Sequence, residues 1–220
     1  MHSPNGLLCA GGDLSIERLV MAYARGIFPW FNQGEPILWW SPDPRCVLMP
    51  TELILSKRDT RTLRLSGWDI RSDTQFAQVL NHCAAPRANY IGAGTWLSTE
   101  MQDAYCALHA AGIAHSVEVF DGDELIGGIY GVAVGGVFCG ESMFGSRSNA
   151  SKGALVALVV GLERMGFAVL DCQVCSPHLL DRGAKDIPRA KFQNLLNEFR
   201  FEQMWRPGLW NDPWVRTELR

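Results

Sequence analysis

The sequence has no long apolar run and no large excess of charge of either sign. Glycine, proline or charged residues interrupt every apolar segment before the roughly 18 residues that a membrane-spanning helix requires. The first eight residues contain neither the basic nor the apolar stretch of a secretory signal, so we expect no signal peptide and no membrane contact. The net charge of −3 excludes a strongly cationic nucleic-acid-binding protein, but it is compatible with a local basic stripe.

The cysteines show no pattern of a disulfide framework. There are seven, an odd number, scattered along the chain, so we expect a reduced, cytoplasmic protein. Cys172 and Cys175 with His178 have the spacing of half a zinc site, but no second CxxC or HxxxH motif completes it. Redox-active CxxC pairs begin a helix, whereas this pair lies in a predicted strand and the loop after it. We therefore expect neither a metal nor a redox role here.

What the chain does have is the composition of a globular protein with a substantial core. Apolar residues make up 47% of its 220 residues and charged residues 20%, which excludes disordered and collagen-like classes. Aromatic and proline-rich segments at 28–31 and 39–45 interrupt the periodic pattern, and their X-Pro steps favour extended chain. We therefore predict a small N-terminal α/β domain at 1–45 and a larger domain at 46–220.

The order of predicted elements indicates an α+β fold. Capping residues and hydrophobic periodicity predict helices near 16–25, 56–65, 74–84, 99–112, 149–165, 177–183 and 188–199. Strands are predicted at 46–49, 68–72, 114–120, 125–134, 137–144 and 167–174. We expect the loop 85–95 to be mobile and the tail 205–220 to be irregular. An antiparallel meander, a glycine-rich loop into a helix, then a strand and a helix is the order found in N-acyltransferase folds.

Two polar residues interrupt the apolar strand predicted at 167–174. Asp171 and Gln173 should point to the same face, because side chains alternate along a strand. Burying them without partners would cost several kcal/mol. One interpretation is a structural hydrogen-bonded pair under the sheet. The other is a carboxylate that orients an amide, whose carbonyl oxygen then accepts a proton from an incoming amine.

Glu141 lies between Gly140 and apolar neighbours near the end of a predicted strand. A lone glutamate is most often solvated or ion-paired, but beside Asp171 it would form an acidic mouth that attracts a cationic substrate. Nearby apolar residues are either ordinary core or a pocket for an apolar side chain. They are Ile129, Phe138, Met143, Leu155 and Leu170.

Aromatic and basic residues suggest contacts with nucleic acid. The tryptophans in question are Trp30, Trp39, Trp40 and Trp96. We expect half of them to be core, whereas an exposed one would stack on a base, a contact worth roughly 1–3 kcal/mol. One predicted helical stripe carries Lys57, Arg58, Arg61 and Arg64, opposed only by Asp59. It is either a solvated helix face or a stripe that follows the phosphates of a nucleic acid.

Seven segments match a known family in their order along the chain. They are GGDL at 11–14, GIFPWF at 26–31, WWSPDPR at 39–45, AHSVE at 114–118, GESMF at 140–144, NASK at 149–152 and DCQ at 171–173. Together they resemble the leucyl/phenylalanyl-tRNA–protein transferases. The resemblance implies a bacterial cytoplasmic enzyme with an acetyltransferase-like (GNAT-type) mixed sheet and flanking helices. Such enzymes move Leu or Phe from tRNA onto proteins that begin with Arg or Lys, which then enter N-end rule degradation.

The resemblance also implies roles for individual residues. Asp171 and Gln173 would form the catalytic pair, and Glu141 would help to hold the acceptor. Trp30 would stack on the terminal adenosine at the tRNA 3′ end, and we count Trp96 with it as substrate-binding. The amino-acid pocket would be lined by Ile129, Phe138, Met143 and Leu170, with Leu155 beside them.

The expected reaction needs no cofactor, because the donor ester is already activated. The α-ammonium of the acceptor, with a pKa near 8, would lose its proton through Gln173 polarised by Asp171, or through the tRNA ribose hydroxyl. Positioning should supply much of the rate. We expect a monomer whose partners are aminoacyl-tRNA and the acceptor protein.

Two other functions remain open on the sequence. The first is an acyl-CoA-dependent N-acetyltransferase, but the loop at 145–152 lacks the Arg/Gln-x-x-Gly-x-Gly/Ala pattern that binds pyrophosphate. The second is a tRNA-binding protein without catalysis. The presence of both Asp171 and Gln173 on a strand opposite Glu141 argues against it.

Overall fold

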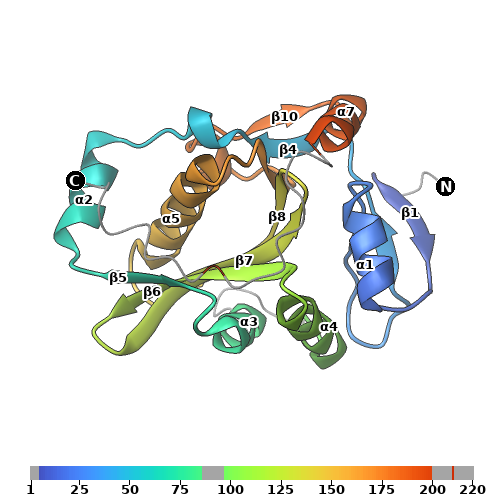
Figure 1. Ribbon diagram of the computed structural model, residues 1–220, viewed down its shortest axis with the longest axis horizontal. Coiled ribbons are helices and arrows are strands. Elements are labelled where there is room, and N and C mark those ends of the chain that lie inside the picture. The colour runs from blue at the N-terminus through green and yellow to red at the C-terminus, as the bar shows by residue number, and fades with distance from the viewer. Residues whose placement is uncertain (1–4, 86–96, 200–209, 211–220) are drawn as a thin grey trace.

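The computed structural model of the chain describes residues 5–85, 97–199 and 210. Its largest element is a seven-stranded mixed sheet (Figure 1). The strands are β4 (Arg45–Leu48), β5 (Asp69–Ser72), β6 (Ala114–Asp121), β7 (Glu124–Val134), β8 (Val137–Gly145), β9 (Val169–Gln173) and β10 (Lys185–Ile187). They are arranged in the order β10-β4-β9-β8-β7-β6-β5. All neighbours are antiparallel except β8 and β9, which run parallel.

Helices cover both faces of this sheet. On one face lies α5 (Ala150–Arg164), whose apolar side chains pack against β6, β7 and β8. On the other face lie α3 (Phe76–Ala84) and α4 (Thr99–Ala110) (Figure 1). Smaller elements are η1 (Pro50–Glu52), α2 (Lys57–Leu65), α6 (Pro177–Leu180) and α7 (Arg189–Phe199). The predicted mixed α+β architecture is confirmed, and the assignment to the acetyltransferase type stays a prediction.

The N-terminal residues form a second, smaller sheet. Its strands β1 (Leu7–Ala10), β2 (Phe28–Pro29) and β3 (Leu38–Trp40) are antiparallel in the order β1-β3-β2, with α1 (Ile16–Tyr23) beside them. Their buried side chains, Leu19 and Tyr23 among them, join the same hydrophobic cluster as residues of α3, α4 and β7. The small sheet thus packs onto the main core, and the domain boundary at residue 45 stays a prediction.

Most predicted elements begin within two residues of their observed positions, and the differences have local causes. The cap of α4 is Ser98, whose Oγ accepts the N–H of Met101 at 3.3 Å, so the cap lies one residue before the predicted start of the helix. The helix predicted at 177–183 ends at Leu180. β10 was not predicted, and it forms by pairing with the edge of β4. The loop expected to be mobile lies almost wholly, and the irregular tail apart from Trp210, outside the described residues.

The parallel contact between β8 and β9 is short, and its end positions the candidate site. The strands pair at three positions, of which Cys139 with Asp171 is the last. β8 nevertheless continues to Gly145 and β9 to Gln173. The side chains just beyond the paired region therefore face each other across the end of the ladder.

Candidate active site

Asp171 is fully buried and paired with Arg45. Its carboxylate oxygens accept hydrogen bonds from Nε and Nη2 of Arg45 at 2.7 and 2.6 Å, which is the two-pronged geometry of a strong ion pair. Nη1 of Arg45 donates to the carbonyl of Gly26 at 3.0 Å. The guanidinium also lies over the rings of Phe28 and Phe192, at 5.0 and 4.7 Å from their centroids. Both charges are out of contact with water, and each compensates the other.

Asp171 contacts Gln173 through the main chain. Its Oδ1 accepts the backbone N–H of Gln173 at 2.9 Å. Gln173 has a φ of 62°, in the left-handed region that non-glycine residues rarely adopt, so the strand alternation ends there. Its side chain reaches Glu141 instead, where Nε2 donates to Oε1 at 2.8 Å. The predicted contact between the carboxylate of Asp171 and the side-chain amide of Gln173 is therefore wrong, because Glu141 orients that amide.

Glu141 occupies a bulge in β8. The pairing of β7 with β8 shifts between Tyr130 and Gly131, which leaves Glu141 as the extra residue. Bulges beside active sites commonly redirect a side chain. While Oε1 of Glu141 accepts the Gln173 amide, Oε2 accepts the hydroxyl of Tyr105 at 2.7 Å. The Tyr105 hydroxyl is in turn 2.8 Å from that of Tyr23 on α1, which extends the network to the helix beside the N-terminal sheet.

Burial changes the proton affinity of this network. It raises the pKa of Glu141 to about 7, because removal from water penalises the charged carboxylate, and hydrogen bonds from the tyrosines only partly offset this. Burial also raises the pKa of Tyr105 and of Tyr23 well above the usual value, so both hydroxyls keep their protons. Glu141 is thus a carboxyl that gains or loses a proton near neutral pH, which suits acid–base work.

Three residues of this network were not identified from the sequence: Arg45, Tyr105 and Tyr23. The sequence contains an indication for Arg45, because a charged residue that begins an apolar strand needs a buried partner. The indication for the tyrosines is weaker. A tyrosine on the apolar face of a helix places a hydroxyl in the core, and that hydroxyl usually finds a partner.

The predicted apolar residues come together on the α5 face of the sheet. Ile129, Phe138, Leu155 and Leu170 are buried in one cluster, and Met143 packs against it partly accessible. Phe138 and Leu170 are partners in the β8–β9 ladder, one position before its end. Trp210 also packs on this cluster, with its ring centroid 5.4 Å from that of Phe138. Phe138 and Leu170 thus approach the end of the ladder on the α5 face, whereas Glu141 bonds to Tyr105 of α4 on the other face.

Among the described tryptophans of the predicted aromatic group, Trp30 is the exposed one. It is 51% exposed, while Trp39 is buried and donates its Nε1 to the carbonyl of Gly11 at 2.8 Å. Trp40 lies beside Trp30, with ring centroids 5.7 Å apart, and its Nε1 donates to the Trp30 carbonyl at 2.6 Å. Trp96 lies outside the described residues. The structure thus leaves Trp30 as an exposed aromatic surface that contacts Trp40 beside the N-terminal sheet.

The four cationic residues of the predicted stripe are exposed on α2. Asp59 does not oppose them, because it is buried and pairs with Lys152 and Arg182 at 2.7 and 2.8 Å. None of Lys57, Arg58, Arg61 and Arg64 has an ion-pair partner among the described residues. Within the part of the chain that the structure describes, their positive charge is therefore uncompensated.

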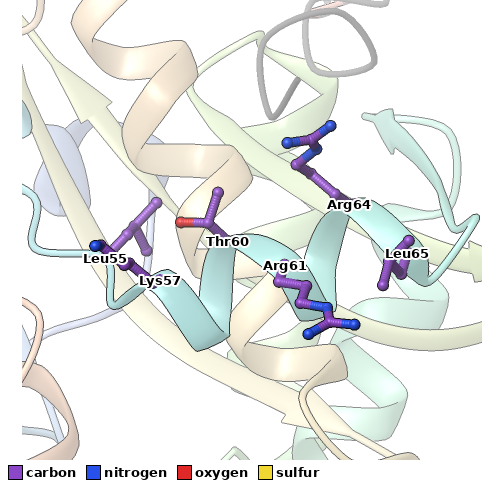
Figure 2. A pocket seen from close by; sticks show the side chains of 6 residues that line it. All are labelled: Leu55, Lys57, Thr60, Arg61, Arg64 and Leu65. Atoms are coloured by element: carbon purple, nitrogen blue, oxygen red, sulfur yellow. The ribbon is translucent and has the colours of Figure 1, made fainter.

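A pocket of about 550 Å³ lies along the same helix (Figure 2). It is lined by Leu55, Lys57, Thr60, Arg61, Arg64 and Leu65. In Figure 1, α2 and the N-terminal sheet lie at opposite ends of the long axis of the molecule. The basic pocket and the N-terminal sheet are therefore far apart, with β8 between them in this view.

The expectation that all seven cysteines are reduced is wrong. Cys46 on β4 and Cys175, just after β9, form a disulfide with their Cα atoms 5.0 Å apart. They are 129 residues apart in sequence, so spacing could not reveal the pair. The other cysteines, Cys172 included, are not disulfide-bonded. Asp186 lies close to both bonded sulfurs, but sulfurs in a disulfide are not thiolate metal ligands.

No helix within the described ranges has the length and apolarity to cross a membrane.

Comparison with known proteins identifies the family. Residues 47–197 match the family described as leucyl/phenylalanyl-tRNA protein transferase, and residues 12–43 match the N-terminal domain of the same family. A relative from Nitrosomonas eutropha, named leucyl/phenylalanyl-tRNA–protein transferase, is 55% identical over 195 residues, which is 89% of this chain and 82% of the relative. One of the same name from Xanthomonas axonopodis is 52% identical over 212 residues, 96% and 84% of the two chains.

Solved structures add little. A functionally unknown conserved protein from Staphylococcus epidermidis aligns with a TM-score of 0.43 and 10% identity, over 83% of this chain and 68% of that one. Such a distant likeness supports no conclusion about function. The family match at 47–197 contains Glu141, Asp171 and Gln173. The alignment with the Xanthomonas relative covers 96% of this chain and so also includes Arg45. The chain therefore belongs to the leucyl/phenylalanyl-tRNA–protein transferase family, and it is a transferase.

Proposed function

We propose that the chain transfers Leu or Phe from aminoacyl-tRNA to the α-amino group of proteins that begin with Arg or Lys, and so marks them for N-end rule degradation. The observation that supports this best is the Gln173 amide. Its backbone N–H is bonded to Asp171 and its side-chain nitrogen to Glu141, at the end of the strand that also carries Leu170 of the apolar cluster. A fixed amide bonded to a carboxyl, on a strand that also contributes to an apolar cluster, suits a reaction that joins an apolar acyl group to a cationic amine.

In the proposed reaction Gln173 touches the attacking amine. No described residue donates to its Oε1, so this oxygen is available to accept an N–H of the amine. An amide oxygen is a weak base, so Gln173 orients the amine, whose proton passes to the departing ribose oxygen. The amine nitrogen bonds to the carbonyl carbon, the ester C–O bond breaks, and the tRNA leaves with a free ribose hydroxyl. Alignment of the two substrates then supplies much of the rate.

The donor side chain would bind in the apolar cluster that includes Phe138 and Leu170. Partial accessibility makes Met143 the residue at its entrance, and a flexible thioether adapts to both Leu and Phe. Discrimination by such a pocket yields only about 1–3 kcal/mol per methylene, so other large apolar amino acids should be used slowly rather than excluded.

The tRNA would contact two separate surfaces. Trp30 would stack on the 3′-terminal adenosine, while the stripe of α2 would contact phosphates further along the tRNA. The distance between them across the molecule fits a long nucleic acid that spans the protein. We further propose a cytoplasmic monomer with an acetyltransferase-like larger domain.

One assay tests the function against its alternatives. The protein is incubated with a peptide that begins with Arg and with either leucyl-tRNA or acetyl-CoA, and the modified peptide is measured by mass spectrometry. Leucyl transfer is expected, with none to a matched peptide that begins with Asp. Acetyl transfer would instead support an acetyltransferase, and tRNA binding without product would support a binding protein.

A further inference from the structure

We propose that Arg45 is a positioning residue for the transfer reaction, because it fixes the carboxylate of Asp171 that holds the backbone of Gln173. The kinetic part of this proposal rests on the proposed function. The geometric part stands on the contacts of Arg45, Asp171 and Gln173 alone.

Arg45 is itself held from three sides. Its Nη1 bonds to the carbonyl of Gly26, and its guanidinium is enclosed by the ring of Phe28 on β2 and that of Phe192 on α7. The side chain is 1% exposed. The planar guanidinium therefore has one orientation, and its Nε and Nη2 impose that orientation on the carboxylate of Asp171.

The orientation of Asp171 is then passed to Gln173. Oδ1 of Asp171 accepts both Nε of Arg45 and the backbone N–H of Gln173, at 2.7 and 2.9 Å. That N–H belongs to a residue with a φ of 62°, a conformation that persists only where surrounding contacts hold it. Rotation of the carboxylate would release it, and the Gln173 amide would lose its alignment with Glu141.

A lysine at position 45 separates this role from charge compensation. Lysine keeps the positive charge near Asp171, so no unpaired buried carboxylate remains, but an ammonium cannot form the two parallel hydrogen bonds. The matched control is Arg71→Lys on β5. Arg71 also pairs with an aspartate, Asp69, and also lies over an aromatic ring, that of Phe120, but at the far edge of the sheet.

The first measurement needs no substrate. Hydrogen exchange of the Gln173 backbone amide is followed by NMR in wild type, Arg45→Lys and Arg71→Lys. The backbone N–H of Gln173 should be protected from exchange in wild type and in the control. Its exchange should be about tenfold faster in Arg45→Lys, while the exchange of core backbone amides of β7 is unchanged. Equal protection of Gln173 in Arg45→Lys and wild type would overturn the proposal.

The second measurement is kinetic. Arg45→Lys should lower kcat for leucyl transfer about tenfold or more, with the KM for leucyl-tRNA within about twofold. If Arg45 acts only through Asp171, the double variant Arg45→Lys/Asp171→Asn should be no slower than Asp171→Asn alone. Fully additive losses would refute this. A wild type that transfers no leucine would refute the proposed function, while the exchange data would still decide whether Arg45 positions Gln173.

Discussion

Gln173 Nε2 lies 2.8 Å from Oε1 of Glu141, across the point where β8 and β9 cease to pair. Two irregularities lie at this contact. A bulge in β8 contains Glu141, and Gln173 has a left-handed backbone. The register of the β8–β9 ladder, if continued, would place positions 141 and 173 side by side on one face. The two residues therefore remain neighbours although neither strand is regular there.

Two substitutions at Gln173 distinguish the catalytic effect of its side chain from the effect of its backbone conformation on stability. Gln173→Ala and Gln173→Gly both remove the amide, so each should lower kcat about 100-fold with the KM for leucyl-tRNA within about twofold. Glycine also tolerates a φ of 62°, so Gln173→Gly should be more stable than Gln173→Ala by about 1 kcal/mol. Steady-state kinetics and urea unfolding provide the measurements. Gln78→Ala, at an exposed site on α3, is the control, and comparable losses in kcat and donor affinity would argue against the role.

Glu141 should select cationic acceptors. Glu141→Gln removes the carboxylate charge, so the KM for a peptide that begins with Arg should rise about tenfold while that for leucyl-tRNA stays constant. A peptide that begins with citrulline keeps the shape of Arg without its charge. Wild type should prefer the Arg peptide over the citrulline peptide, and the variant should lose most of that preference. An unchanged preference would show that another group recognises the acceptor.

The raised pKa of Glu141 makes stability depend on pH. Between pH 4.5 and about 7 the folded protein holds a proton on Glu141 that the unfolded chain has lost, so stability falls as pH rises through this range. The cost above pH 7 is up to about 3 kcal/mol. The charged neighbours Asp171 and Arg45 compensate each other, and the facing phenols of Tyr23, Tyr105 and Tyr130 remain neutral.

Glu141→Gln tests this sign directly, because an amide does not titrate. Relative to wild type, the variant should gain up to about 3 kcal/mol in free energy of unfolding between pH 4.5 and pH 8. Urea unfolding at the two pH values measures the difference. Glu163→Gln, at an exposed glutamate on α5, should show no such gain. A constant difference between Glu141→Gln and wild type would mean that the carboxyl titrates as it does in water.

The sequence predicted those parts of the molecule that local pattern determines. The β6–β7–β8 meander has turn residues between apolar runs, and α5 has a continuous apolar pattern, so both were found. The pairing of Arg45 with Asp171 joins residues 126 positions apart, and no local pattern encodes it. β10 is similar, since Lys185–Ile187 contains two charged residues and becomes a strand only by pairing with β4.

The sequence predicted which polar residues belong to the candidate site, but not which hydrogen bonds join them. Asp171, Gln173 and Glu141 could be selected because each is a polar residue in an apolar strand context. Which of them bond to each other depends on a bulge and on one backbone angle, and neither follows from side-chain alternation. The tyrosine hydroxyls that complete the network come from two helices on the opposite side of the sheet from α5.

The disulfide predicts a specific thiol count. Denatured, unreduced protein should contain five reactive thiols, namely those of the free cysteines, and reduced protein all seven. Peptide mapping after alkylation should leave Cys46 and Cys175 unmodified as a linked pair. Cys46→Ala is the matched variant, and it should show six thiols with or without reduction. Seven thiols in unreduced wild type would show that the two cysteines are not bonded under the conditions used.

The basic stripe on α2 should make tRNA binding sensitive to salt. Each phosphate contact releases counterions, so removal of one contact should lower the slope of log affinity against log salt by about 1. Arg61→Ala and Arg64→Ala should each weaken binding at low salt and flatten this slope, whereas Lys185→Ala, a cation already paired with Glu52, should leave it unchanged. Because Asp59 is engaged with Lys152 and Arg182, Asp59→Asn should not mimic the loss of a stripe arginine. Fluorescence anisotropy with labelled tRNA at several salt concentrations measures each slope, and a wild-type affinity independent of salt would remove α2 from the tRNA interface.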